Sequence, residues 1–535
     1  MSEKNWQDQF KIFELQDEID GLKSKNRRLE KKNRHFQSTK AYKVWQKYAS
    51  LKDKPQNQTK KAKSLKSIKV AMISDEFTFN SFKHEFKAIP LTPKNWKKQF
   101  EKKKPDIFFC ESAWAGYDGK TDKRHWKGKI FKKYDTENRT ELLEILEHCH
   151  ENSIPTVFWN KEDPPYYRAE EYSFAETAKL FDYIFTSSEE CIKHYKADFN
   201  HPNVNALMFA GQPSLFNPLN LSGEKIEEVV FAGSYYVKHP ERCALMDMIF
   251  DKIIEQWGGL MIFDRVYYEK WTQFPERFTK YTVPPITYEE TAEVYKKMDW
   301  GLNINTVTDS NTMFARRVFE LSLCYVNILT NYSKGVDKIF GDNVFVFDEI
   351  DKLPDFNNPY TEKRLNNLYN VLENHTYTQR WMQILDTMGF EYSVPKMDVT
   401  MIYKLSDVND IEDIIARFER IDYDDKVLAI LLEDKAIKDD IKEKYPQIDK
   451  VFKTKNQARN GIKTKFWMVC DMDIDDDFIR HAMLHYTYIH DRVSITPSDD
   501  KFKLSVESGY ENKLVSRKNR SYLTGKDLEV YTYTI

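Results

Sequence analysis

The chain has 535 residues, too many for one compact domain, so two to four domains are expected. Hydrophobic residues make up 41% and aromatic residues 14%, which fills several cores and excludes a wholly disordered chain. The 82 Lys and Arg nearly cancel the 84 Asp and Glu, and the resulting net charge of −2 gives no support to nucleic-acid binding.

Targeting signals and cysteine usage predict the compartment. The N-terminus MSEKNWQDQF lacks a basic-then-apolar signal pattern, and no apolar run reaches the roughly 18 residues of a membrane span. The six Cys are far apart and form no CxxC pair, which is typical of buried thiols rather than of disulfides or a zinc site. We therefore expect a cytoplasmic protein.

Residues 10–36 carry the clearest periodic signal. Apolar and Asn residues recur at alternating spacings of four and three: Leu15, Ile19, Leu22, Asn26, Leu29, Asn33 and Phe36. This is a heptad seam, and a buried Asn at the Ile19 position fixes register and favours a parallel two-stranded coil. Residues 1–39 are therefore predicted to be a coiled-coil helix that forms a parallel homodimer. The alternative is a single amphipathic helix that lies on the domain that follows it.

A basic segment follows. Residues 40–69 contain ten Lys and a single acidic residue, Asp53. Such a composition predicts a solvated linker over residues 40–67. It would also allow peripheral contact with an anionic membrane, at the inner face, with about 1 kcal/mol per favourably placed Lys.

The stretch 68–215 alternates short apolar runs with a helical pattern. The predicted strands are 67–74, 105–112, 154–160 and 181–188, and a helix over 136–151 lies between the second and third. This alternation is typical of a parallel sheet with crossover helices. Residues 68–215 are therefore predicted to form one Rossmann-like domain.

A second series of strands occupies residues 216–392. Its predicted strands are 227–236, 258–264, 299–305, 327–332 and 343–349, with helices between them. Two successive α/β domains imply a cleft between them, and ligands of such sheets bind outside the carboxyl ends of the strands.

The third region, residues 396–535, opens as strand 399–407, helix 411–421 and strand 426–434. A further strand within 465–478 ends on the acidic cluster that begins at Asp471. A small α/β domain is expected here.

The first candidate site is the turn after strand 227–236. Gly233 and Ser234 stand where this strand meets the turn, and Lys238 and Arg242 follow closely. Backbone N–H groups at such a turn and helix start suit an anion, and the two cations would bond to a diphosphate. The alternative is that Gly233 serves only the backbone of a turn.

The second candidate site begins a helix before strand 327–332. Arg316, Arg317 and Glu320 stand at the start of this otherwise apolar helix. Two guanidiniums would hold a diphosphate, and a carboxylate would accept from the hydroxyls of a ribose. The alternative is an exposed Arg–Glu pair that contributes a few tenths of a kcal/mol.

The segment TYEETAEVYKKMDWGLNINTVTDSNTMFARRVFELSLCYVNILTN resembles the CgeB-like, spore-maturation-type glycosyltransferases. The shared pattern is Y-x-E, a strand ending in L-N, then R-V-F-E, then a strand ending in L-T. Shorter segments resemble other parts of the same family: FAGSYY, FFCESAWAGYDGK, PTVFWNKEDPPYY and YTQRWMQILDTMG. The resemblance covers about residues 68–392.

This resemblance implies a GT-B glycosyltransferase with two Rossmann-like domains facing a cleft, no required cofactor and no bound metal. The donor would be a nucleotide-sugar, with UDP-sugar preferred. By matching position, Arg316 and Arg317 with Lys238 or Arg242 would stabilise the departing diphosphate, and Glu320 would bind the ribose. The chain departs from the family at Leu323-Cys324-Tyr325, where small residues are usual, and at Thr312, where many retaining enzymes carry a further Glu.

The acceptor side is predicted in residues 68–215. Glu111, Trp114, Gly116, Asn160, Lys161 and Asp163 follow predicted strands, and Trp114 and Trp159 would offer flat faces to a sugar. Glu111 or Asp163 would orient or deprotonate the acceptor hydroxyl. For each of these residues the alternative is a role in loop structure.

Residues 398–535 resemble, in part, a truncated family-2-type GT-A glycosyltransferase domain. Asp471 and Asp473 form a D-x-D pattern after an apolar strand, and such a pair is able to hold Mg²⁺ or Mn²⁺. We expect a non-catalytic accessory domain, with a metal site as the alternative.

Together, these patterns predict transfer of a sugar to a hydroxyl of a cell-envelope glycan or teichoic-acid-type polymer. The rival prediction is a non-catalytic coiled-coil scaffold or glycan-binding protein with degenerate glycosyltransferase domains.

Overall fold

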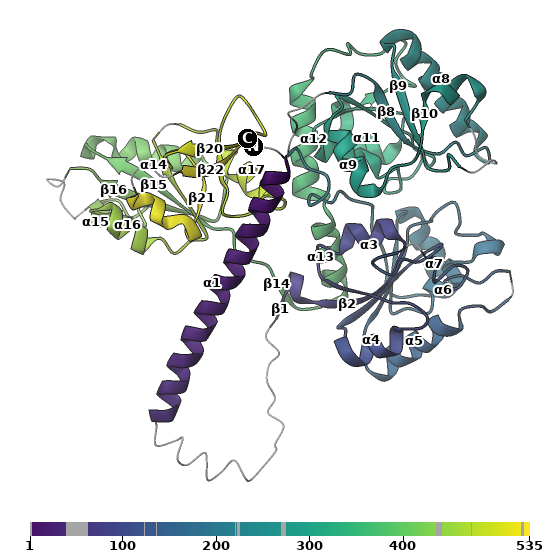
Figure 1. Ribbon diagram of the computed structural model, residues 1–535, viewed down its shortest axis with the longest axis horizontal. Coiled ribbons are helices and arrows are strands. Elements are labelled where there is room, and N and C mark those ends of the chain that lie inside the picture. The colour runs from purple at the N-terminus through teal and green to yellow at the C-terminus, as the bar shows by residue number, and fades with distance from the viewer. Residues whose placement is uncertain are drawn as a thin grey trace. The chain divides into compact units, whose positions relative to one another are not determined.

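The computed structural model describes residues 3–38, 62–121, 123–134, 136–219, 221, 225–268, 274–434, 441–471, 473–525 and 529–535. These residues form two compact units (Figure 1). One unit is Lys63–Pro395, and the other combines helix α1 with Lys396–Ile535. Most of the predicted linker 40–67 lies outside the described residues. No helix among the described residues is long and apolar enough to span a membrane.

The first domain of unit Lys63–Pro395 is a six-stranded parallel sheet in the order β3-β2-β4-β5-β6-β7. Its strands are β2 (Lys69–Ile73), β3 (Lys87–Pro90), β4 (Ile107–Glu111), β5 (Thr156–Asn160), β6 (Tyr183–Thr186) and β7 (Val204–Ala206). Its helices are α3 (Glu76–Phe82), α4 (Trp96–Lys103), α5 (Thr140–Glu151), α6 (Ala175–Ala178) and α7 (Ile192–Phe199). The central strands β4 and β5 are buried throughout, because helices cover a parallel sheet on both faces.

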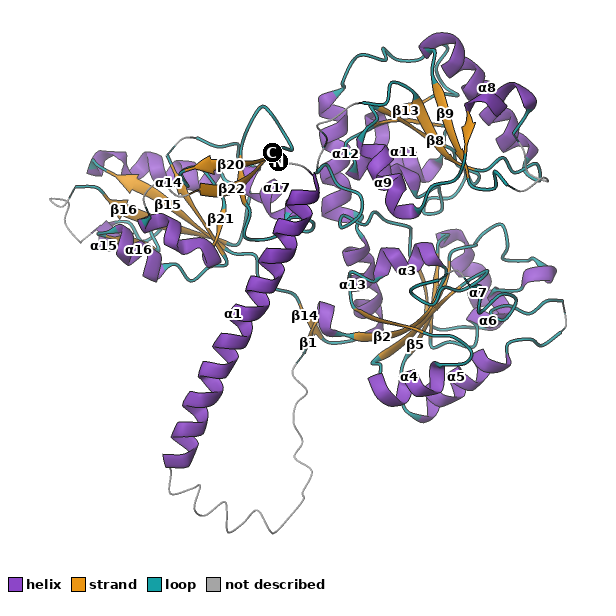
Figure 2. Cartoon of the chain, in the orientation of Figure 1, coloured by secondary structure: helices purple, strands orange, loops and turns teal. Residues whose placement is uncertain are grey.

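The second domain is also a six-stranded parallel sheet, in the order β10-β9-β8-β11-β12-β13. Its strands are β8 (Val229–Gly233), β9 (Leu260–Asp264), β10 (Thr282–Val283), β11 (Trp300–Asn303), β12 (Asn327–Thr330) and β13 (Phe345–Val346). Helices α8 (Pro240–Trp257), α9 (Tyr288–Lys296), α10 (Arg317–Leu323), α11 (Lys334–Phe340) and α12 (Thr361–Asn374) connect or flank them (Figure 2). The predicted strands of both domains are confirmed.

The end of the second domain returns to the first. Helix α13 (Tyr377–Met388) packs on the first domain, where Trp381 is fully buried with its ring centroid 4.6 Å from that of Phe86. The chain then pairs β14 (Tyr392–Ser393) with β1 (Lys63–Ser64), which closes the unit at its two ends. The two Rossmann-like domains of the predicted α/β fold are therefore one compact body.

The C-terminal domain has a sheet in the order β17-β16-β15-β18-β21, parallel except for β21. Its elements are β15 (Val399–Leu405), α14 (Ile411–Arg420), β16 (Lys426–Leu432), α15 (Ile441–Lys444), β17 (Lys450–Phe452), α16 (Lys455–Gly461), β18 (Phe466–Cys470), α17 (Phe478–His485) and β21 (Val515–Ser516). A small sheet of β19 (Ser494–Thr496), β22 (Glu529–Thr534) and β20 (Leu504–Ser508) adjoins it. Helix α1 (Glu3–Ser38) confirms the predicted N-terminal helix, while its pairing with a second copy stays a prediction.

The contact of α13 with the first domain predicts a stability difference. Trp381→Ala should lower the free energy of unfolding by about 3–5 kcal/mol, because a large side chain is lost from a closed core. Gln383→Ala, on the same helix, removes one exposed hydrogen bond to the Ala206 carbonyl and should cost about 1 kcal/mol or less. Urea unfolding of the full chain measures both. Equal losses would show that α13 does not hold the unit together.

Candidate functional site

The strand order of the second domain identifies where a ligand would bind. Numbered within this domain, the order is 3-2-1-4-5-6, and the chain reverses its direction of travel between β8 and β11. In doubly wound sheets the crevice outside the carboxyl ends of two such strands binds ligands. Gly233 ends β8 and Asn303 ends β11, so the turn after Gly233 lies at this point.

The turn after β8 is crowded around Gly233, and the hydroxyl of Ser234 in this turn has no hydrogen-bond partner among the described residues. A Cβ on Gly233 would lie 2.6 Å from the Phe231 ring and 3.4 Å from Nη2 of Arg317, so the position requires glycine. Ser234 is buried, and its Oγ has no hydrogen-bond partner among the described residues. A buried hydroxyl without a partner is unfavourable unless a ligand supplies one.

Three guanidiniums gather beside this turn: Arg242, Arg265 and Arg317. Arg242 donates to the Ser234 carbonyl at 3.1 Å, and its Nε has no partner among the described residues. Arg317 donates to the Ala232 carbonyl and to the Tyr295 hydroxyl. Arg265 donates to the Tyr236 hydroxyl, and the guanidiniums of Arg242 and Arg265 lie 5.3 and 5.9 Å from the Tyr236 ring centroid.

These three cations share one electrostatic feature. Within the described ranges of the chain, none of them forms an ion pair with a carboxylate. Burial lowers the pKa of the Arg242 guanidinium to about 10, and the positive charge of Arg317 acts in the same direction. The cluster therefore carries positive charge that no ion pair among the described residues neutralises.

Arg316 does not join this cluster. Its Nε donates to Oε1 of Glu320 at 2.8 Å, and its guanidinium lies 3.7 Å from the ring centroid of Phe77 in the first domain. The Tyr288 hydroxyl donates to the same Glu320 oxygen at 3.0 Å. The prediction that Arg316 and Arg317 act together is corrected, because neighbouring helix residues point about 100° apart. Lys238 is exposed in the turn before α8.

The first domain gathers charge at the carboxyl ends of β2, β4 and β5. Asp75 accepts from the backbone N–H groups of Trp114, Ala115 and Gly116 at 2.8–2.9 Å. Nζ of Lys161 lies 3.2 Å from both the Asp75 and the Glu111 carboxylates. Gly116 is required here, because its φ is +75° and a Cβ would lie 2.6 Å from Trp126.

The pKa values in this triad follow from burial and from Lys161. Burial raises the pKa of the Glu111 carboxyl to about 7, against the opposing effect of Lys161. Burial would also raise the pKa of Asp75, but Lys161 and the backbone N–H donors lower it overall. Burial lowers the pKa of the Lys161 ammonium. The negative charges of Glu111 and Asp75 have the larger combined effect, so the pKa is raised overall.

Two residues predicted on the acceptor side have their side chains inside the protein. Asp163 is fully buried and accepts from the Thr186 and Tyr195 hydroxyls and from Asn160. Trp159, on β5, is also fully buried, and its Nε1 donates to the Leu207 carbonyl. Neither side chain therefore offers an exposed face to a sugar in this structure.

Glu111 is likewise fully buried, whereas Asp75 and Lys161 keep 19% and 10% of their side chains exposed. Half-buried Trp114 packs against Tyr166 with ring centroids 5.3 Å apart, and its indole interacts with the Glu162 carboxylate. Arg265 of the second domain is near enough to Glu162 to lower its pKa, although burial raises it overall. Glu162 therefore lies within electrostatic reach of Arg265.

The two domains are held together beside this site. Thr312 donates to the Ser187 carbonyl at 2.9 Å and accepts from the Glu189 N–H at 2.8 Å. Glu190 accepts from the Ser310 hydroxyl at 2.6 Å and from the Asn311 N–H at 2.9 Å. Thr312, the position where the resembled family often has Glu, thus joins the domains. An open pocket of about 590 Å³ adjoins these contacts, with lining from Glu189, Lys193, Lys334 and neighbouring residues.

The acidic segment of the C-terminal domain faces cations of its own domain. Asp471 Oδ2 lies 2.8 Å from Lys404 Nζ, and Asp473 Oδ1 lies 3.4 Å from Arg417 Nε and 3.7 Å from Arg420 Nη2. Among the described residues, these two carboxylates do not meet in a group of three possible metal ligands. The ion pairs neutralise the charge that a divalent cation would need.

Sequence reasoning missed Asp75, Glu162 and Arg265. Asp75 and Arg265 each follow directly after a predicted strand, at 67–74 and 258–264, so the carboxyl-end rule would have found them. Glu162 lies between Lys161 and Asp163, and only the folded chain shows which of these three side chains faces the second domain.

Part of the chain is similar to a known protein family. Residues 252–386 match the family model described as glycosyl transferase-like. No curated protein matches the chain. The match confirms the predicted enzyme class, a glycosyltransferase, at the level of this domain, and the CgeB-like family stays a prediction.

Solved structures are similar in fold. An alpha-glucosyltransferase in complex with UDP and a 13-mer DNA is 11% identical, with 60% of this chain and 100% of that chain covered and a TM-score of 0.42. A variant of S. aureus TarM in complex with fondaparinux, alpha-GlcNAc-glycerol and UDP is 10% identical, with 52% and 55% covered and a TM-score of 0.31. An alpha1,3-fucosyltransferase is 10% identical, with 63% and 92% covered and a TM-score of 0.31.

The buried acid Asp163 predicts a pH dependence of stability. Burial raises its pKa from 3.8 to about 7, so between these values the folded chain holds a proton that the unfolded chain has lost. The free energy of unfolding should therefore fall as pH rises toward 7, by on the order of 1 kcal/mol per pH unit for this group.

Asp163→Asn cannot titrate, so its unfolding free energy should fall less steeply. Urea unfolding at pH 5, 6, 7 and 8 compares the two slopes, and Glu111 contributes equally to both proteins. Parallel pH profiles for Asp163→Asn and the wild type would contradict the assignment of a protonated Asp163.

Proposed function

We propose that residues 63–395 transfer a sugar from a UDP-sugar to a hydroxyl acceptor. The observation that carries this proposal is the cluster of Arg242, Arg265 and Arg317 at the switch point of the second sheet, which forms no ion pair with a carboxylate of the described residues. Arg242 is buried and Arg317 is half-buried, and cations in such places are unfavourable in the free protein without counter-charge. A diphosphate neutralises them through charge-assisted hydrogen bonds.

The arginines would act mainly on the departing diphosphate. As the bond between the anomeric carbon and the phosphate oxygen breaks, negative charge grows on that oxygen. Arg242 and Arg317 are already held by backbone carbonyls, so they would stabilise this charge without rearranging. The free Ser234 hydroxyl would donate to a phosphate oxygen, and the adjacent start of α8 adds a favourable dipole.

We assign the ribose to Glu320. Arg316 and Tyr288 both donate to its Oε1, which fixes the carboxylate and leaves Oε2 for the ribose hydroxyls. Arg316 thus positions Glu320 and does not hold the diphosphate. This division of roles between adjacent arginines refines the prediction from sequence.

On the acceptor side, we assign the contacts to Asp75, Lys161, Glu162 and Trp114. Asp75 and Lys161 are the partly exposed members of the charged triad, and Glu162 lies within electrostatic reach of Arg265. A carboxylate here would accept the proton that the acceptor hydroxyl loses when its oxygen bonds to the anomeric carbon. The acceptor class, a cell-envelope glycan or teichoic-acid-type polymer used at the cytoplasmic face of the membrane, rests on the family resemblance.

The arginine cluster predicts opposite stability effects for neighbouring residues. Arg242→Met and Arg317→Met should leave the melting temperature of the free protein unchanged or raised, because each removes an unneutralised cation. Arg316→Met should lower the melting temperature. The free energy of unfolding should fall by about 1–3 kcal/mol, because Glu320 loses its partner.

Thermal-shift titration with UDP and UDP-sugars completes this test. UDP at 100 times its Kd should stabilise the wild type by about 2.7 kcal/mol. Arg242→Met and Arg317→Met should lose at least nine-tenths of the affinity, because each removes a charged hydrogen bond to the diphosphate. A full UDP shift in both variants would refute the site. Absence of any shift in the wild type would favour the scaffold alternative.

The ion pairs of the acidic segment predict that metal is not needed for donor binding. The UDP-induced shift should survive EDTA and should persist in the double variant D471N/D473N. The same preparations, assayed for UDP release from UDP-sugar, show whether transfer or hydrolysis shares this tolerance. Loss of both signals on chelation would move the donor site to the C-terminal domain.

A further inference from the structure

Helix α1 presents two different faces, and its own C-terminal domain covers one of them. Trp6 and Phe13 are each only 6% exposed, and both pack edge-on against Tyr531, with ring centroids 5.7 and 5.3 Å away. Phe13 also lies 5.3 Å from the ring of His490. These contacts dock the first turns of the helix on the domain.

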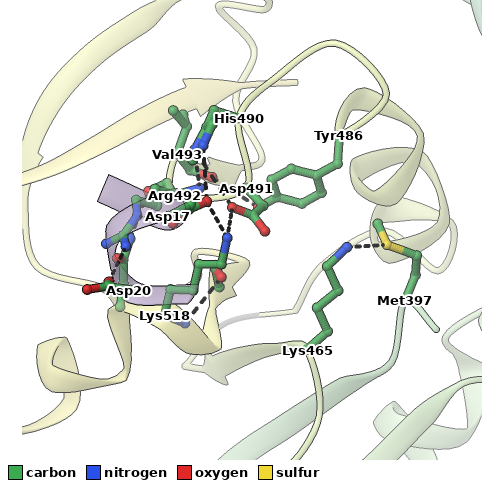
Figure 3. A network of polar contacts seen from close by, with 12 residues as sticks. Asp17, Asp20, Met397, Lys465, Tyr486, His490, Asp491, Arg492, Val493 and Lys518 are labelled. Carbon is green, nitrogen blue, oxygen red and sulfur yellow. Dashed lines mark hydrogen bonds and ion pairs between the residues drawn. The ribbon is translucent and has the colours of Figure 1, made fainter. Parts of the chain in front are cut away.

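A polar network extends this docked face (Figure 3). Arg492 donates to Asp17 at 2.8 Å and to Asp20 at 3.0 Å, and Lys518 also pairs with Asp17. His490 Nε2 lies 3.3 Å from Asp17 Oδ2. Although Asp17, His490 and Asp491 come close enough to hold a cation, Arg492 and Lys518 already neutralise the carboxylates. The network therefore attaches helix α1 to the C-terminal domain.

The other face of α1 is apolar and exposed. Ile12, Leu15, Ile19 and Leu22 follow one another at spacings of three, four and three, and each side chain is between 46% and 58% exposed. Asn26 continues this line and is also exposed. Four large aliphatic side chains in one line on a helix normally mark a binding surface.

The two faces lie on nearly opposite sides of the helix. If Ile12 and Ile19 take heptad position a, Leu15 and Leu22 take position d. The docked residues then fall at b and f: Trp6, Phe10, Phe13, Asp17 and Asp20. At 100° per residue the centres of the two faces are about 150° apart, so docking leaves the a/d face free.

We propose that the exposed a/d face binds the same face of a second copy of this chain, as a parallel two-stranded coiled coil. Ile at a with Leu at d favours two strands. A parallel register places Asn26 opposite Asn26 of the second copy, where the two amides bond to each other. An antiparallel register would instead oppose Asn to apolar side chains.

Charge complementarity supports the same register. In a parallel pair, each g residue faces the e residue five positions later on the other helix. Glu18 then faces Lys23 of the second copy. Both side chains are exposed, so they are available for this contact.

The attachment of α1 to the C-terminal domain determines what the dimer would bring together. Because Arg492 and Lys518 hold the back of α1, each C-terminal domain is carried on the outer side of the coil. Dimerisation therefore pairs two C-terminal domains as well as two helices. This proposal does not rest on the glycosyltransferase function.

The first experiment disrupts the seam in the full-length protein. Sedimentation velocity should show a species of twice the 63.8 kDa chain mass for the wild type and a monomer for I19K/L22K. Glu14→Lys is the matched control, because Glu14 is exposed at position c, on neither face. A monomeric wild type, a trimer, or a dimer that survives I19K/L22K would overturn the proposal.

The second experiment tests the register by charge exchange. Glu18→Lys or Lys23→Glu alone should raise the dimer Kd several-fold, because like charges then face each other at both g–e positions. The double variant E18K/K23E should restore the wild-type Kd. If each single variant dimerises as tightly as the wild type, or if the double variant is as weak as the singles combined, the parallel register is wrong.

Discussion

The arrangement of the second domain depends on one electrostatic constraint. Three arginines lie close together, and none of them forms an ion pair with a carboxylate of the described residues. Arg242, Arg265 and Arg317 meet where β8 ends, and the nearby carboxylate, Glu320, is already paired with Arg316. Such a cluster costs stability in the free protein, so the surrounding sheet must hold it in place. Gly233 allows the approach of Arg317, and the carbonyls of Ala232 and Ser234 receive its donors and those of Arg242.

The first domain has the complementary charge. There the excess is acidic, since one ammonium, Lys161, serves both Asp75 and Glu111, and Glu162 lies next to it. Under the proposed function, the two sheet edges would offer cations to a leaving group on one side and carboxylates to an incoming hydroxyl on the other. The hydrogen bonds of Thr312 and Glu190 across the domains keep these groups in register. A transfer reaction needs both chemistries at one place.

The sequence predicted the strands and their ends far better than it predicted which side chains contact one another. Buried apolar runs located the strands of both sheets, because a parallel sheet covered on both faces needs them. The carboxyl-end rule then led to Gly233 and Glu111. It did not reveal that Asp163 turns inward to Thr186 and Tyr195, or that Arg316 turns to Glu320, because adjacent residues differ only in direction. Those directions depend on residues distant in the chain, such as Phe77 under Arg316.

The N-terminal helix docks on the C-terminal domain and not on the domain that follows it, and this docking leaves the predicted coiled-coil face exposed. One amphipathic stripe would have forced a choice, since the same residues cannot face two partners. Here Phe13 and Asp17 face the C-terminal domain, while Leu15 and Ile19 remain exposed. A helix that is apolar on two sides is costly in water unless both sides are covered. Covering the second side with another copy satisfies that requirement without displacing the first contact.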